Sequence, residues 1–80
     1  MSEKIKQDIS IGANLKRLRK NAKLSQQNVS IKLDLMGLDI SRSIISQMEI
    51  GKYSIRVSVL RALKEIYKVD SYDEFLRICK

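Results

Sequence analysis

Residues 39–52, DISRSIISQMEIGK, carry many side chains that form hydrogen bonds and few that are acidic. Arg42 offers a planar fork of donors, and Gln47 offers an amide that both donates and accepts. Ser43 and Ser46 lie between them and add hydroxyl groups. An arginine can donate two hydrogen bonds to guanine, and a glutamine can bond adenine. These residue types therefore predict a surface that hydrogen-bonds base edges and does not repel phosphates.

A short helix must hold these side chains in place. Ser41 is a residue type that caps helix N-termini, and a glycine ends the segment. The sequence predicts a helix over about residues 42–50, with Ile45 and Met48 pointing inward. Ile44 is predicted to face outward, where it can touch a thymine methyl group or pad the flank of the helix.

Apolar residues that recur at intervals of three and four predict four further helices. Their ranges are about residues 11–21 after Ser10, 26–36 after Ser25, and 57–67, with a last helix opening at the capping box Ser71-Tyr72-Asp73-Glu74. The residues expected in their cores are Ile11, Leu15, Leu18, Ala22, Val29, Leu33, Met36, Leu60, Leu63, Ile66, Tyr67, Phe75, Leu76 and Cys79.

No segment shows sustained strand alternation, and neither a proline nor a linker divides the chain. A length of 80 residues suffices for one small domain with one core. The predicted fold is therefore all-α: a single five-helix domain over residues 11–80, preceded by a flexible N-terminal arm of residues 1–10.

The formal charge of +7 is unevenly distributed. Residues 14–56 hold nine basic and three acidic side chains, whereas residues 57–80 hold five and four. A basic region of this kind indicates binding to nucleic acid or to an anionic membrane surface, or else a solvated face that aids solubility.

Several classes of protein are disfavoured. There is no histidine, the one cysteine is Cys79, and the three glycines are isolated, so zinc sites, histidine bases and phosphate loops lack their residues. We expect no enzyme, no metal and no cofactor. No apolar run is long enough for a membrane span and no signal peptide is visible, which favours the cytoplasm.

Three stretches in order, LKRLRKNAKLSQQNVSIKL, SRSIISQMEIGK and LRALKEIYKVDSYDEFL, resemble the phage-repressor-type helix-turn-helix family, also called Cro/cI-like or XRE. The resemblance covers roughly residues 11–76. The motifs that carry it are Leu18-Arg19, Leu24-Ser25-Gln26, the small Ser30, and Glu49-Ile50-Gly51. It implies a lambda-repressor-like architecture in which the helix over residues 42–50 enters the major groove of DNA.

The resemblance also implies roles for individual residues. Arg19 and Glu49 would form an ion pair between the first and third helices; otherwise Arg19 faces DNA and Glu49 is a solvated acid. Ser30 would lie where two crossing helices approach closely. The residues expected to contact phosphates are Gln26, Gln27, Lys52, Tyr53 and Arg56, although Tyr53 can equally be an ordinary loop aromatic.

The sequence departs from the family at the connection between the second and third helices, which usually has about three or four residues. Residues 34–40, DLMGLDI, are interpreted as an extra helical turn through Met36 and a loop whose Leu38 and Ile40 reach back to the core. The longer connection does not affect the expectation of a third helix, but it leaves the angle of that helix open.

The predicted function is a sequence-specific transcriptional regulator, a repressor, whose partner is double-stranded DNA. The alternatives are an antitoxin that also binds a toxin, and a helix-turn-helix adaptor that binds protein. One reading helix covers few base pairs, so a homodimer on half-sites about 34 Å apart is expected. The nearly neutral C-terminal part repels itself least, and its Tyr72, Phe75, Leu76 and Ile78 form the predicted self-association surface.

Overall fold

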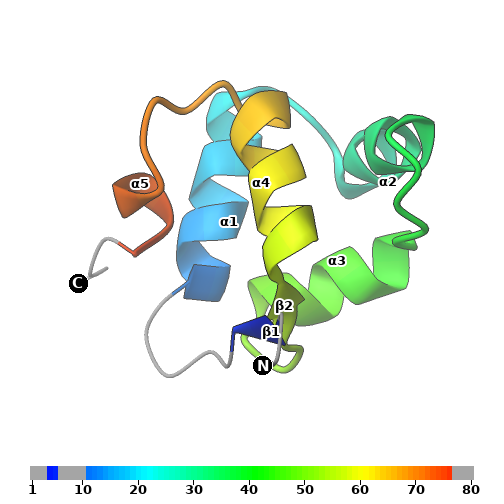
Figure 1. The fold of residues 1–80 in the computed structure, drawn as a ribbon, viewed down its shortest axis with the longest axis horizontal. Helices are drawn as coiled ribbons and strands as arrows, with labels where there is room; N and C mark the ends of the chain where they lie inside the picture. The colour runs from blue at the N-terminus through cyan, green and yellow to red at the C-terminus, as the bar shows by residue number, and fades with distance from the viewer. Residues whose placement is uncertain (1–3, 6–10, 77–80) are drawn as a thin grey trace.

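The computed structural model describes residues 4–5 and 11–76, and within them it contains five helices and one short ladder (Figure 1). The helices are α1 (Ile11–Asn21), α2 (Gln26–Leu35), α3 (Arg42–Glu49), α4 (Val57–Ile66) and α5 (Asp73–Leu76). The ladder joins β1 (Lys4–Ile5) to β2 (Ile55–Arg56). The predicted all-α class is confirmed, and the helix ends in the described residues lie close to the predicted ones.

Serine side chains begin two of these helices as predicted. Ser25 Oγ accepts from the Asn28 N–H at 3.0 Å, and the Asn28 side chain accepts from the Ser25 N–H at 3.1 Å, which makes a reciprocal capping box. Ser41 Oγ accepts from the Ile44 N–H at 3.3 Å. Near α5, Ser71 Oγ accepts from the Asp73 N–H at 3.1 Å. The predicted cap at Ser10 lies outside the described residues.

The ends of α2 and α3 are set by glycines with positive φ. Gly37 has a φ of +81° and Gly51 a φ of +79°, a conformation that costs a glycine little. After α3, the Gly51 N–H donates to the Met48 carbonyl and the Lys52 N–H donates to the Gln47 carbonyl, which is a Schellman motif. This motif fixes where the chain turns away from α3.

The core lies between α1, α3 and α4 and is closed by α2 and α5. Its buried apolar residues are Ile11, Leu15, Leu18, Val29, Leu33, Ile40, Ile45, Met48, Ile55, Val59, Leu60, Ala62, Leu63, Tyr67 and Phe75. Leu38 packs partly against this core, so both connection residues predicted to reach back do so.

Two predicted core residues are exposed. Met36 is 43% exposed, because α2 ends at Leu35 and Met36 is its C-cap, outside the regular helical rotation. Leu76 is 44% exposed, because α5 has four residues and Phe75 occupies its inward face. The predicted burial of both side chains is therefore wrong, and Cys79 lies outside the described residues.

The helices α1 and α3 approach each other closely at Gly12 of α1. A Cβ atom there would lie 2.6 Å from the Met48 carbonyl oxygen and 2.7 Å from that of Glu49. Only a glycine lets the backbone of α1 rest on the end of α3. Ser30, whose place at such a crossing stays a prediction, donates its hydroxyl to the Ile40 carbonyl at 2.7 Å and so ties the connection to α2.

The β ladder pairs Lys4 with Arg56 and Ile5 with Ile55 in an antiparallel register. It differs from the flexible arm predicted for these two N-terminal residues, and the rest of residues 1–10 lies outside the described residues. The ladder sits below α4 and next to α3 (Figure 1). The N-terminal segment is thus fixed, at Lys4 and Ile5, beside the point where α4 begins.

Candidate nucleic-acid interface

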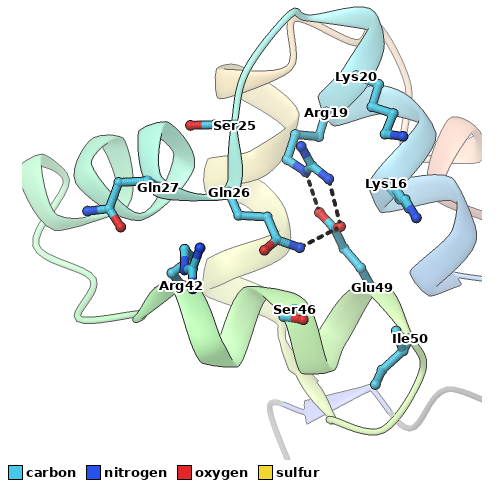
Figure 2. Close-up of a pocket in the computed structure, with 10 residues that line it drawn as sticks. All are labelled: Lys16, Arg19, Lys20, Ser25, Gln26, Gln27, Arg42, Ser46, Glu49 and Ile50. Atoms are coloured by element: carbon cyan, nitrogen blue, oxygen red, sulfur yellow. Dashed lines mark hydrogen bonds and ion pairs between the residues drawn. The ribbon is translucent and has the colours of Figure 1, made fainter.

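A depression of about 460 Å³ opens between α1, the start of α2, and α3 (Figure 2). Its lining residues are Lys16, Arg19, Lys20, Ser25, Gln26, Gln27, Arg42, Ser46, Glu49 and Ile50. The basic side chains outnumber the single acid, Glu49, and that acid is neutralised by a buried partner. The depression is therefore positively charged and suited to an anionic ligand.

The partner of Glu49 is Arg19, and together they form the base of the depression. Arg19 Nε lies 2.7 Å from Glu49 Oε2, and Arg19 Nη2 lies 3.0 Å from Glu49 Oε1. Arg19 Nη1 also donates to the Leu24 carbonyl at 2.9 Å. The Glu49 side chain is 3% exposed and that of Arg19 is 10% exposed. The hydrogen bond to Glu49 raises the pKa of Arg19 above its usual value.

Gln26 completes this group, because its Nε2 donates to Glu49 Oε1 at 3.1 Å (Figure 2). Glu49 of α3 is thereby bonded to α1 through Arg19 and to the start of α2 through Gln26. A carboxylate only accepts, so the amide nitrogen of Gln26 must face it. The Gln26 side chain is thus held within the protein, and the predicted contact of Gln26 with phosphate, through the backbone N–H groups at the start of α2, stays a prediction.

The residues of α3 divide between two faces. Ile45, Met48 and Glu49 are buried, whereas Arg42, Ser43 and Gln47 are exposed. Ser46 is half-buried and lines the depression. The exposed side carries only hydrogen-bonding residues, as expected for the residues predicted to contact bases.

Ile44 is the exception among these predicted base-contacting residues. It is half-buried and packs against the core. The reason is helical spacing, because Ile44 and Met48 are four residues apart and lie on the same face. Of the two roles expected for Ile44, the contacts favour the one in which it pads the flank of the helix, and its contact with a base stays a prediction.

The predicted phosphate-contacting residues fall into two groups. Gln26 and Gln27 lie at the start of α2 and line the depression. Lys52, Tyr53 and Arg56 are exposed in the segment after α3, where Arg56 belongs to β2. The two groups lie at opposite ends of α3 in the chain order, on either side of the exposed Arg42 and Gln47.

Some residues important to this surface were not predicted. Lys16 and Lys20 of α1 line the depression. Both lie on the charged face of their helix, and their spacing of four was the available signal.

Another residue that was not predicted, Asn14, lies in the core away from this surface. Asn14 is fully buried, and its Nδ2 donates to the Phe75 carbonyl at 2.9 Å, which docks α5 on α1. Asn14 lies three residues after Ile11, and this position on an apolar face could have identified it.

Tyr67 provides a prediction about pH. It is buried close enough to Glu49 and Arg19 to feel their charges, and burial raises the pKa of its phenol because phenolate is poorly solvated there. Its contribution to stability is complete below the unfolded pKa of about 10 and is lost as the pH rises above it. We expect the free energy of unfolding to fall more steeply above pH ~10 than in Tyr67→Phe, by up to about 1.4 kcal/mol per pH unit.

Urea unfolding across this alkaline range checks the expectation, with Tyr72→Phe as the matched control because Tyr72 is exposed. Equal slopes in the wild type and Tyr67→Phe would contradict it.

Comparison with known proteins gives one match. A protein-family model described as "Helix-turn-helix domain" matches residues 10–77, which is most of the chain. No curated protein and no solved structure shows a significant match. Among the described residues, no helix is both long and apolar enough to cross a membrane.

Proposed function

The chain belongs to the helix-turn-helix domain family, and from this premise we propose that it is a sequence-specific regulator of transcription that binds double-stranded DNA. The family itself indicates a DNA-binding regulator. The finer proposal is a repressor that inserts α3 into the major groove and reads bases with its exposed face. The observation that carries it is the exposed row of Arg42, Ser43 and Gln47 beside a positively charged depression.

The supporting geometry is a helix held rigidly against the protein. α3 is fixed at its start by the Ser41 cap and at its end by the Glu49 bonds and the Schellman motif. A reading helix needs this rigidity, because each base contact requires accurate placement of the side chain. Residues at the start of α2 and in the segment after α3 can then hold phosphates and set its register on the duplex.

A single α3 in the major groove contacts only a few base pairs. The proposed DNA-binding state is therefore a homodimer on two half-sites about 34 Å apart. Tyr72 and Leu76 are 40% and 44% exposed and are available for self-association. Phe75 is fully buried inside the subunit, so its predicted place on that surface is wrong. Ile78 lies outside the described residues.

The experiment distinguishes residues that recognise bases from residues that only contact phosphates. Binding sites are first selected from random duplex DNA, and variants are then measured on the selected and on a scrambled duplex across a salt series. Gln47→Ala should cost about 1–3 kcal/mol on the selected site and relax preference at one base pair. Arg42→Ala should do the same at another base pair.

The matched controls are Lys52→Ala and Arg56→Ala. Each should weaken binding to both duplexes alike and reduce the salt slope by roughly one unit, because one fewer counterion is released. Equal losses on both duplexes for Arg42→Ala and Gln47→Ala would show that α3 does not read bases. The absence of any selected sequence would favour a protein-binding adaptor.

A further inference from the structure

A second depression of about 460 Å³ lies between the α2–α3 connection and α4. Its apolar lining comes from Met36 and Leu38 of the connection, Ala62 of α4, and Tyr72. Met36 is 43% and Tyr72 40% exposed, so this apolar surface is open to solvent. We call it the α4 groove.

Two more exposed apolar residues lie on α2, the helix that precedes Met36. Leu35 is 81% exposed and Ile31 is 50% exposed, one helical turn apart on the same face. Neither lines the depression between α1, α2 and α3. Exposed apolar side chains such as those of the α4 groove occur at surfaces that bind other molecules when they form a contiguous patch.

The rim of the α4 groove is cationic. Arg61 and Lys64 line it together with one acid, Glu65. Lys64 Nζ lies 5.5 Å from the centre of the Tyr72 ring, which holds this charge at the edge of the groove. Within residues 11–76, neither Arg61 nor Lys64 forms an ion pair. The groove therefore has an apolar floor and two cations, Arg61 and Lys64, at its edge. Its chemical complement is a peptide segment with apolar side chains on one face and acidic side chains next to them.

The α4 groove does not overlap the candidate nucleic-acid interface. The two depressions share no lining residue. In Figure 2, the helix α4, which lines the groove, lies behind the labelled side chains of the first depression. A ligand in the groove would therefore leave the exposed face of α3 free. A second copy paired groove to groove fits poorly, because Arg61 and Lys64 of one groove would face the same two cations of the other.

We propose that the α4 groove binds an acidic amphipathic helix of a different protein. The apolar side of that helix lies on Met36, Leu38 and Ala62, and its carboxylates face Arg61 and Lys64, in the helix-in-groove mode. This inference does not depend on DNA binding or on the proposed homodimer, and it would give the chain a second partner besides DNA.

The probe is a short, fluorescein-labelled synthetic peptide with leucines at i, i+3, i+4 and i+7 and glutamates at the other positions. Binding to the full chain is followed by fluorescence anisotropy. Arg61→Glu and Met36→Glu should each weaken binding by about tenfold or more, because one reverses a rim charge and the other removes apolar floor and adds a repelling acid. Both side chains are exposed, so folding should be unaffected.

The matched control is Lys16→Glu, which makes the same change of charge in the other depression. It should leave peptide binding within about twofold while it weakens DNA binding, and Arg61→Glu should show the reverse. A peptide of the same composition with its leucines scattered should bind about tenfold more weakly.

Three results would overturn the proposal. Equal loss in Arg61→Glu and Lys16→Glu would mean that only the total charge attracts the peptide. Equal binding of the scattered peptide would mean that the apolar floor plays no part. A change in sedimentation of Met36→Glu without peptide would assign the groove to a second copy of the chain.

Discussion

Glu49→Ala should lower the free energy of unfolding by about 3–5 kcal/mol, because it leaves the Arg19 guanidinium buried without its counter-charge. The substitution also removes the acceptor of the Gln26 amide, which donates to the same carboxylate. For a domain whose total stability is about 5–15 kcal/mol, this is a large fraction. Urea unfolding followed by circular dichroism measures it. DNA binding should weaken in parallel, because Glu49 fixes the end of α3.

Glu65→Ala is the control for the loss of a carboxylate, because Glu65 is exposed on α4 and should change stability by less than about 0.5 kcal/mol. Arg19→Ala should also destabilise the fold. The double variant should lose less than the sum of the two single losses, because each single change leaves a buried charge behind. Unchanged unfolding in both single variants would show that the pair contributes nothing to the fold.

Phe75→Ala should lower the free energy of unfolding by about 3–5 kcal/mol, because it removes a fully buried aromatic ring and leaves a cavity. α5 has four residues, and Phe75 is its buried side chain. The carbonyl of Phe75 accepts from the buried Asn14, so a displaced α5 would also leave that amide unsatisfied. Chemical unfolding measures the change.

Leu76→Ala is the neighbouring control and also tests the dimer surface. Its side chain is 44% exposed, so unfolding of the monomer should change little while self-association weakens. Sedimentation measures the self-association. A Phe75→Ala variant with unchanged unfolding and weaker association would show that Phe75 faces a partner and not the core.

The helices of this chain could be predicted because their signals are local. Ser25 and Ser41 cap helices, Gly37 and Gly51 end them, and apolar spacing identifies the faces that pack. Arg19 and Glu49 are thirty positions apart, and a resemblance to a family brought them together where spacing alone could not.

The features that were missed depend on contacts between distant segments. The backbone contact of Gly12 with α3 has no signature in residues 11–21, because it depends on how closely two helices cross. The same is true of Gln26, whose partner is set by the position of Glu49. The two roles expected for Ile44 could not be separated from the sequence, because outward and inward positions on a short helix differ by a single residue.

The division of α3 into two faces has a consequence for how such a protein can evolve. Arg42, Ser43 and Gln47 are exposed and lie outside the buried core, so replacing them should change stability by less than about 0.5 kcal/mol. Ile45, Met48 and Glu49 hold the helix regardless of what its outer face carries. Under the proposed function, a duplicated gene could therefore acquire a new DNA target through a few substitutions, with no compensating change elsewhere in the chain.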